Sequence, residues 1–169
     1  MRRVVTGHRN GKSVILEDAE IPSHDMFGNE GTMLWRTEGT PTIPVKENEH
    51  KKQIPIEFPK PGGTFLNISL LLPDKEVLKN TKEKGVDIVK AWRNTFKDDF
   101  GMHTSDTIDY DIIVSGELWM ELDDGAEIHL KPGDCVVQNG TRHAWRNKGS
   151  ENCIMASVAV GAKRKKSTI

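Results

Sequence analysis

The stretch GMHTSDTIDYDIIVSGE, residues 101–117, determines which fold this chain can adopt. Its second half alternates as a β-strand does, with successive side chains pointing to opposite faces. One face carries Tyr110, the only tyrosine of the chain, which we expect to pack in the sheet with its hydroxyl hydrogen-bonded. The other face is expected to point inward and holds His103, Ser105, Asp109, Asp111 and Ile113.

Two further segments repeat these features, PGD at residues 132–134 and NGTRHAWRN at residues 139–147. Like the first stretch, they place a histidine and turn glycines beside strand-like alternation. If the stretches converge, His103, Asp109 and His143 meet at one point. Two neutral imidazoles and one carboxylate can bind a divalent metal ion and leave positions open for a substrate. The sequence therefore predicts a site in this half of the chain.

The pattern around these stretches predicts an all-β fold. From residue 102 to residue 160 the chain reads as short strands separated by turns. Strands at this regular spacing are typical of a small antiparallel barrel or sandwich. A barrel of this size has room for one small ligand in its mouth.

The N-terminal part adds further strands. The turn signal Asn10-Gly11-Lys12 predicts a hairpin. Residues 32–37 and 64–72 are strand candidates, and the Pro-rich residues 39–63 between them are expected to form an extended loop.

One helical segment is predicted at residues 74–96, with Asp74 as its cap and Gly85 as the point where it divides. Its apolar residues fall on one side. We expect a lid or a brace without catalytic content.

Composition narrows the class of protein. At 169 residues and 19.0 kDa, one domain is the simplest expectation. A net charge of -1 gives no reason to expect nucleic acid or an anionic membrane as partner, and no apolar run approaches the length of a membrane span. Cys135 and Cys153 are expected to be buried thiols in a reducing compartment, the cytosol. The basic residues 163–166 are expected to form a solvated tail.

The two stretches resemble the paired motifs of the cupins. His103, Asp109 and Gly116 match the first motif, and the second motif is matched by Gly140, His143 and Asn147. Two positions depart from the pattern: Ser105 stands where most cupins have a second histidine, and Asp109 stands where they usually have a glutamate. The run DTIDY at residues 106–110 is similar to that of small cupins from bacterial and fungal metabolic gene clusters.

The resemblance implies a single cupin jelly-roll barrel (a double-stranded β-helix) over residues 1–169. Its parts are N-terminal strands and a Pro-rich loop (1–73), a helical insertion (74–96), the core motifs (101–160) and a basic tail (161–169). Members of the family commonly form homodimers through their N-terminal strands. The resemblance also implies a divalent metal ion (Fe, Mn, Ni or Zn) held by His103, Asp109 and His143, with a metal-free site as the alternative.

The remaining candidates follow from strand parity and from residue chemistry. Asp106, Asp109 and His143 are the candidates for proton transfer. Arg142 and Arg146 are expected to point away from His143. Ser105, Asp111 and Trp145 are expected to line a substrate pocket, whereas His8, His24, His50 and His129 lack acidic or imidazole partners at informative spacing.

The leading functional hypothesis is a small-molecule enzyme with metal-assisted lyase or isomerase chemistry, such as dehydration or decarboxylation, on an oxygenated, aromatic or polyketide-like substrate. One alternative is a non-haem metal oxidoreductase or dioxygenase. The other is a non-catalytic barrel that binds a small ligand.

Overall fold

The computed structural model describes residues 1–45, 54 and 57–165. Within them the fold is mostly β, as predicted, with two short helices. The strands are β1 (Arg2–Arg9), β2 (Lys12–Glu20), β3 (His24–Met26), β4 (Asn29–Thr37), β5 (Thr64–Leu71), β6 (Thr107–Ser115), β7 (Leu118–Glu121), β8 (Glu127–Leu130), β9 (Cys135–Gln138), β10 (Ala144–Arg146) and β11 (Cys153–Gly161).

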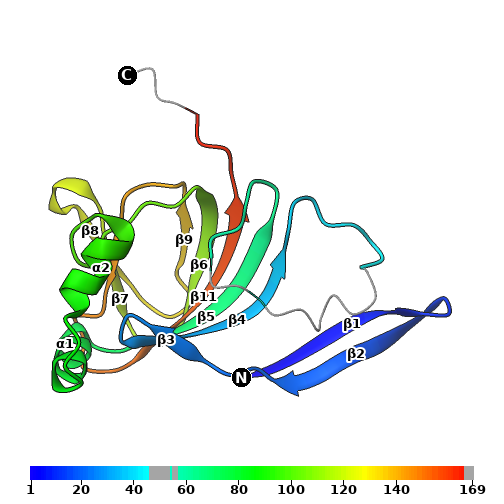
Figure 1. Cartoon of the computed structure of the whole chain (residues 1–169), viewed down its shortest axis with the longest axis horizontal. Coiled ribbons are helices and arrows are strands. Elements are labelled where there is room, and N and C mark those ends of the chain that lie inside the picture. The colour runs from blue at the N-terminus through cyan, green and yellow to red at the C-terminus, as the bar shows by residue number, and fades with distance from the viewer. Residues whose placement is uncertain (46–53, 55–56, 166–169) are drawn as a thin grey trace.

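The strands form a jelly-roll arrangement of antiparallel sheets. The larger sheet has six strands in the order β3-β4-β5-β11-β6-β9, and a three-stranded sheet has the order β10-β7-β8. In Figure 1, β4, β5, β11 and β6 run side by side, with β7 and the helices at the other end of the molecule. The chain crosses between the two sheets several times after β5, so segments distant in sequence meet inside.

The predicted N-terminal hairpin is confirmed. Asn10 and Gly11 both have positive φ, 51° and 77°, as the tight turn of a twisted hairpin requires. β1 and β2 pair only with each other among the described residues. Figure 1 shows this hairpin projecting away from the rest of the fold.

The helical segment divides at Gly85, as predicted, into α1 (Asp74–Glu83) and α2 (Ile88–Phe96). The predicted cap at Asp74 is wrong: Pro73 holds the cap position, and Asp74 instead accepts a hydrogen bond from the backbone N–H of Asn147 at 3.1 Å. Neither described helix is long and apolar enough to cross a membrane.

Strand β6 shows the predicted alternation of buried and exposed residues. Its inward residues Thr107, Asp109, Asp111 and Ile113 are buried, and the residues between them are exposed. The expectation that Tyr110 packs in the sheet is wrong, because its side chain is 44% exposed on the outer face.

Two expectations about the rest of the chain also fail. Cys153 is buried as expected, but Cys135 is exposed; both are free thiols. The basic tail is not simply solvated, since Arg164 forms an ion pair with Asp106 and donates to the carbonyl oxygen of Ser105 at 2.7 Å. His50 and Lys166 lie outside the described residues.

Candidate functional site

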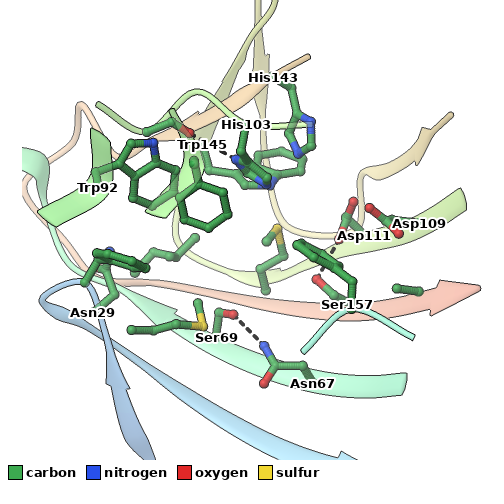
Figure 2. A pocket seen from close by; sticks show the side chains of 18 of the residues that line it. Asn29, Asn67, Ser69, Trp92, His103, Asp109, Asp111, His143, Trp145 and Ser157 are labelled. Carbon is green, nitrogen blue, oxygen red and sulfur yellow. Dashed lines mark hydrogen bonds between the residues drawn. The ribbon is translucent and has the colours of Figure 1, made fainter. Parts of the chain in front are cut away.

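A cavity of about 540 Å³ lies against the inner face of the six-stranded sheet. The floor is formed by inward residues of β5, β11 and β6, and residues from the helices and from β10 complete the wall. His103, Asp109 and His143 all line it, so the predicted convergence on one cavity is observed. Figure 2 shows the two imidazoles side by side above the sheet that carries Asp109 and Asp111.

His103 and His143 are brought together by a backbone bridge. The backbone N–H of each donates to the carbonyl oxygen of the other, at 2.9 and 3.0 Å. This antiparallel bridge joins the segment before β6 to the segment before β10. It places the ring centroids 4.3 Å apart, in the lining of the cavity.

A hydrogen bond of the His103 ring shows which of its two nitrogens carries the proton. Its Nδ1 lies 3.1 Å from the carbonyl oxygen of Gly101, which can only accept, so Nδ1 carries the proton of the neutral ring. Burial, followed by the neighbouring charge of His143, lowers the pKa of His103 to about 4. At neutral pH the imidazole is therefore uncharged, and the lone pair of Nε2 is free.

His143 is more deeply enclosed, with 2% of its surface exposed. Its Nδ1 lies 2.6 Å from Nε2 of Gln138 and 3.0 Å from the carbonyl oxygen of Thr141. Burial lowers the pKa of His143, against the opposing effects of the Thr141 carbonyl and of Asp109. Both imidazoles are thus neutral at neutral pH.

Two carboxyl groups of β6 line the same cavity. Burial raises the pKa of Asp111 to about 6, although the Ser157 hydroxyl donates to its Oδ1 at 2.6 Å. Burial also raises the pKa of Asp109, against the hydroxyls of Thr107 and Ser105 and the charge of His143. Asp109 is 8% exposed, and its Oδ1 is a buried atom without a hydrogen-bond partner among the described residues. Such an atom is costly to leave unpaired.

The three predicted metal ligands do not form a closed ligand set in this arrangement. Across residues 1–45, 54 and 57–165, no three His, Cys, Asp or Glu side chains lie close enough together to hold a metal ion. The imidazoles adjoin each other, but Asp109 on β6 does not complete the set. In this arrangement the described residues do not form a three-ligand site, and the bound metal ion stays a prediction.

The helical segment forms part of the cavity wall, which is compatible with the expected lid or brace. The Trp92 indole of α2 donates to the carbonyl oxygen of Met102 at 2.9 Å, which fixes α2 beside the first motif. The Trp92 and Phe96 rings lie 5.7 and 5.4 Å from the His103 ring. Phe27, after β3, packs on Trp92 at 4.9 Å. Three aromatic rings thus enclose one side of the cavity around His103.

The other predicted residues divide between the cavity and the surface. Asp111 and Trp145 line the cavity, and the Trp145 ring is 5.7 Å from the His143 ring. Ser105 is buried and accepts from the Thr107 hydroxyl at 2.7 Å, outside the lining. Asp106 is likewise outside the lining, in its ion pair with Arg164.

Arg142 and Arg146, on either side of His143 in the second motif, differ in where their side chains point. Arg142 points outward, as predicted, and forms an ion pair with Asp98 at 2.6 Å. Arg146 was also expected to point away, but it lines the cavity and donates to Glu121 Oε2 at 2.7 Å and to the carbonyl oxygen of Phe100 at 2.8 Å. Its long side chain turns back over the rim.

Three residues at or beside the cavity were not predicted from the sequence: His24, Asn67 and Gln138. His24 of β3 lines the cavity with a buried Nε2 that has no hydrogen-bond partner in the part of the chain that the structure describes. Asn67 is 6% exposed; its Nδ2 donates to Ser69 Oγ at 2.8 Å, and its Oδ1 is without a partner in that same part. Polar residues at alternate positions of the apolar stretch TFLNISLLL, residues 64–72, were an available signal for Asn67. His129, by contrast, does have an acidic partner, Glu117, at 2.9 Å.

Comparison of the chain with known proteins finds similarity to proteins named for fungal biosynthetic clusters. No protein-family model matches it. It is 47% identical over 47 residues to the phomopsin biosynthesis cluster protein C' of Diaporthe leptostromiformis, covering 28% of this chain and 25% of that protein. It is 42% identical over 62 residues to the oryzines biosynthesis cluster protein J of Aspergillus oryzae, covering 36% and 35%. The chain thus spans about a quarter to a third of the length of these relatives.

A longer match has lower identity. The cupin-domain-containing oxidoreductase virC of Hypocrea virens is 25% identical over 146 residues, which cover 86% of this chain and 66% of that protein. Among solved structures, a cupin 2 conserved barrel domain protein from Salinispora arenicola is 14% identical and has a TM-score of 0.46, over 83% of this chain and 82% of that one. The strand topology, the two motifs and the cupin-domain relatives confirm the resemblance seen in the sequence: this chain carries a cupin-type jelly-roll domain.

Proposed function

We propose that the protein is an enzyme of small-molecule metabolism that moves protons on a carbonyl compound bound in the cavity. The observation that carries this proposal is the adjacent pair of neutral imidazoles in a cavity that aromatic rings line in part. A cavity of about 540 Å³ is in the range of drug-sized ligand sites. The aromatic wall favours a flat, largely apolar substrate with oxygen groups at one end.

His103 has the geometry of a general base. Its free Nε2 would take a proton from the carbon next to a carbonyl group, and the electron pair of that C–H bond moves onto the carbonyl oxygen. Return of the proton to another carbon completes an isomerisation. Its transfer to a leaving hydroxyl group releases water and completes a dehydration. Because burial keeps the imidazole unprotonated at neutral pH, its Nε2 lone pair is available to accept the proton, and the resulting imidazolium is acidic enough to return it.

The surroundings of the pair support this chemistry. The Trp92 and Phe96 rings exclude water from one side of His103, which lengthens the life of an enolate. Asp111 lines the same cavity as a carboxyl group that can be protonated near neutral pH, and this makes it a second proton donor. Dehydration and isomerisation therefore remain the leading hypotheses, with the metal ion as a separate prediction.

Deuterium exchange tests the proposal. The protein is incubated in D2O without oxygen, with 2-tetralone and 4-hydroxy-4-phenylbutan-2-one as probes, and label uptake and water loss are followed by mass spectrometry. We expect catalysis that drops at least about a hundredfold in His103→Gln, in line with the usual contribution of a positioned base. His129→Gln is the matched control, because that ring stacks on Trp119 outside the cavity. Exchange at the background rate, or equal rates in wild type and His103→Gln, would refute the proposal.

An oxidative reaction is the second candidate, because relatives carry the name cupin-domain-containing oxidoreductase. It requires molecular oxygen as co-substrate. Turnover only in aerated buffer, with oxygen consumed in step with product, would favour it over proton transfer. Probe binding with neither reaction would instead favour a ligand-binding barrel. Elemental analysis of protein purified without chelators, wild type against His143→Ala, tests the metal prediction separately.

A further inference from the structure

Residues 75–102, which contain most of α1 and all of α2, are called the lid segment below. In the part of the chain that the structure describes, backbone hydrogen bonds join this segment to the sheets only at its two ends. At one end the N–H of Asp74 donates to the carbonyl oxygen of Asn147 at 2.9 Å, and at the other end His103 forms its backbone bridge with His143. Between these points every backbone hydrogen bond stays within residues 73–102. The two helices can therefore move away from the sheets without breaking a strand pairing (Figure 1).

The turn between β3 and β4 is the surface on which both helices rest. Its first residue, Phe27, packs on the Trp92 and Phe96 rings of α2, with centroid distances of 4.9 and 5.7 Å. Its second residue, Gly28, faces α1, and a Cβ added there would lie 3.0 Å from Thr81 Cγ2. A side chain at this position would therefore push α1 away from the turn.

Phe27 occupies a backbone conformation that disfavours its side chain. The φ angles of Phe27 and Gly28 are 53° and 83°, nearly the same as the 51° and 77° of Asn10 and Gly11 in the N-terminal hairpin. A two-residue turn of this kind favours Asn or Gly at its first position, because a bulky side chain is strained at positive φ. The N-terminal hairpin has the favoured residue, and the β3–β4 turn does not. What phenylalanine adds to this turn is its ring, which contacts α2 and lines the cavity.

One ion pair fastens the lid segment to the second motif. Arg142, which precedes His143, donates to both oxygens of Asp98, which follows α2, at 2.8 and 2.6 Å. The Arg142 and Asp98 side chains are 33% and 22% exposed. Ions that remain in contact with water attract each other only modestly, so this pair can separate and form again.

We propose that the lid segment swings open at its two ends to admit the ligand of the cavity, and that the β3–β4 turn and the Arg142–Asp98 pair hold it closed. In the closed position the aromatic rings of α2 lie against His103, as Figure 2 shows for Trp92. Lids that open and close in this way commonly control the entry and release of ligands. The inference requires that the cavity bind a ligand, and it does not depend on the proposed proton transfer.

Thiol labelling with iodoacetamide tests the opening without any ligand. Thr81→Cys places a reporter at a position of α1 that is 6% exposed, and Cys135→Ser removes the exposed native thiol. Cys153, which is fully buried in β11, reports the opening of the six-stranded sheet. Since a local opening requires less free energy than unfolding of the sheet, we expect the reporter to react at least about tenfold faster than Cys153.

Phe27→Asn tests the contact between the turn and the helices. It removes two aromatic contacts from α2 but suits the turn, so we expect the reporter to react at least about tenfold faster again, with a change of less than about twofold at Cys153. If Thr81→Cys and Cys153 react at the same rate, or if Phe27→Asn accelerates both thiols equally, there is no separate lid.

Stopped-flow binding of 2-naphthol, followed by quenching of tryptophan fluorescence, tests the role in ligand entry and needs no cysteine variant. We expect Asp98→Ala to raise the association and dissociation rate constants together by about threefold to fivefold, the effect of losing one exposed ion pair. Because a gate affects entry and exit alike, Kd should stay within about twofold. Asp18→Ala is the matched control, since Asp18 forms the same double contact with Arg2 on the N-terminal hairpin.

Unchanged rate constants in Asp98→Ala, or equal changes in Asp18→Ala, would overturn the role of the lid segment in ligand entry. A rise in the dissociation rate constant alone, with weaker binding, would show that Asp98 only supports the closed cavity, and this too would contradict the inference. If the lid is confirmed and deuterium exchange is absent, the proposed function is lost and the lid remains.

Discussion

The hydroxyl of Ser157 donates to Asp111 Oδ1 at 2.6 Å, between neighbouring strands on the inner face of the six-stranded sheet. The two residues are direct partners in the register of β11 and β6. Both are buried, and Asp111 is only 4% exposed. Burying a carboxyl group at such a place costs less free energy when the group is neutral than when it is charged.

We therefore predict that Asp111→Asn stabilises the protein at alkaline pH. Burial raises the pKa of Asp111 to about 6 from an ordinary value of 3.8. The folded protein thus binds the proton more tightly than the unfolded chain, and the stability from this group is complete below pH 4 and is lost as the pH rises through about 6. The asparagine mimics the neutral acid and should be more stable than wild type by about 1–3 kcal/mol at pH 8, with no gain at pH 4.

Urea unfolding at pH 4, 6 and 8 measures this difference. Asp124→Asn is the control, because it removes the same charge from an exposed turn whose positive φ, 57°, suits asparagine. A gain of equal size at all three values of pH, or in the control, would contradict the explanation.

The sequence was informative wherever one face of a strand could be read directly. The alternation in residues 107–115 predicts that Asp109 and Asp111 point inward, and the structure shows both buried. The spacing of the two motifs predicts that His103 and His143 meet, and both line one cavity. The alternation cannot reveal the distance from a strand residue to a loop residue, so the sequence alone could not decide whether Asp109 and the two imidazoles form one ligand set.

Other errors have a different physical origin. Helical periodicity shows which side of residues 88–96 is apolar, but it does not show what that side covers, and here it covers the cavity. His24 was missed because β3 is too short for an alternation to be seen. Arg146 was misplaced because a long side chain can return to the face opposite its Cβ.

Gly116 provides a prediction about folding. It has a φ of 74°, and a Cβ at this position would lie 2.4 Å from the carbonyl oxygen of Asn152 and 2.8 Å from Cys153 Cα. Since both neighbours are backbone atoms, they cannot move aside cheaply. We expect Gly116→Ala to lower the free energy of unfolding by at least about 3 kcal/mol.

Gly125→Ala separates the two causes in a thermal or urea unfolding experiment. Gly125 has a φ of 71°, and a Cβ added there would meet no atom within 4 Å, so only the backbone penalty of about 1–2 kcal/mol applies. Equal losses in the free energy of unfolding at Gly116 and Gly125 would show that the close contact between Gly116 and the backbone at the start of β11 contributes nothing.

The outer face of β6 leads to a prediction about assembly. Tyr110, Ile112 and Val114 are 44%, 44% and 53% exposed, and Tyr110 lies beside the exposed Val137 of β9. A contiguous apolar face of this kind is typical of an interaction surface. We expect a second copy of the chain to cover it, so Ile112→Lys should halve the mass measured by light scattering.

The matched variant is Ile15→Lys, on the N-terminal hairpin. Ile15 is 64% exposed, and the hairpin is where the family resemblance places the dimer contact. Loss of the dimer in this variant, with Ile112→Lys still dimeric, would move the interface to the hairpin. A monomeric wild type would refute both positions.

Asn67 leads to a prediction about the ligand. Its side chain is buried at the cavity floor, its Nδ2 donates to Ser69 Oγ, and its Oδ1 has no partner among residues 1–45, 54 and 57–165. An unpaired buried acceptor is satisfied by a ligand that brings a hydroxyl or N–H group. We expect the wild type to bind 2-naphthol about tenfold more tightly than naphthalene, because one net hydrogen bond is worth about 1–1.5 kcal/mol. Quenching of Trp92 and Trp145 fluorescence, both at the cavity, reports the binding.

Asn67→Leu should bring the affinities for the two probes to within about twofold, while naphthalene binds at least as well as before. Ser69→Ala is the control, because it leaves the Asn67 oxygen in place and should preserve most of the preference. A preference that survives in Asn67→Leu would mean that the hydroxyl is recognised elsewhere, with the unpaired Oδ1 of Asp109 as the next acceptor to test. The test compares only the ratio of the two affinities. A general change in cavity shape would lower the affinity for both probes and leave their ratio unchanged, so it would not give the predicted result.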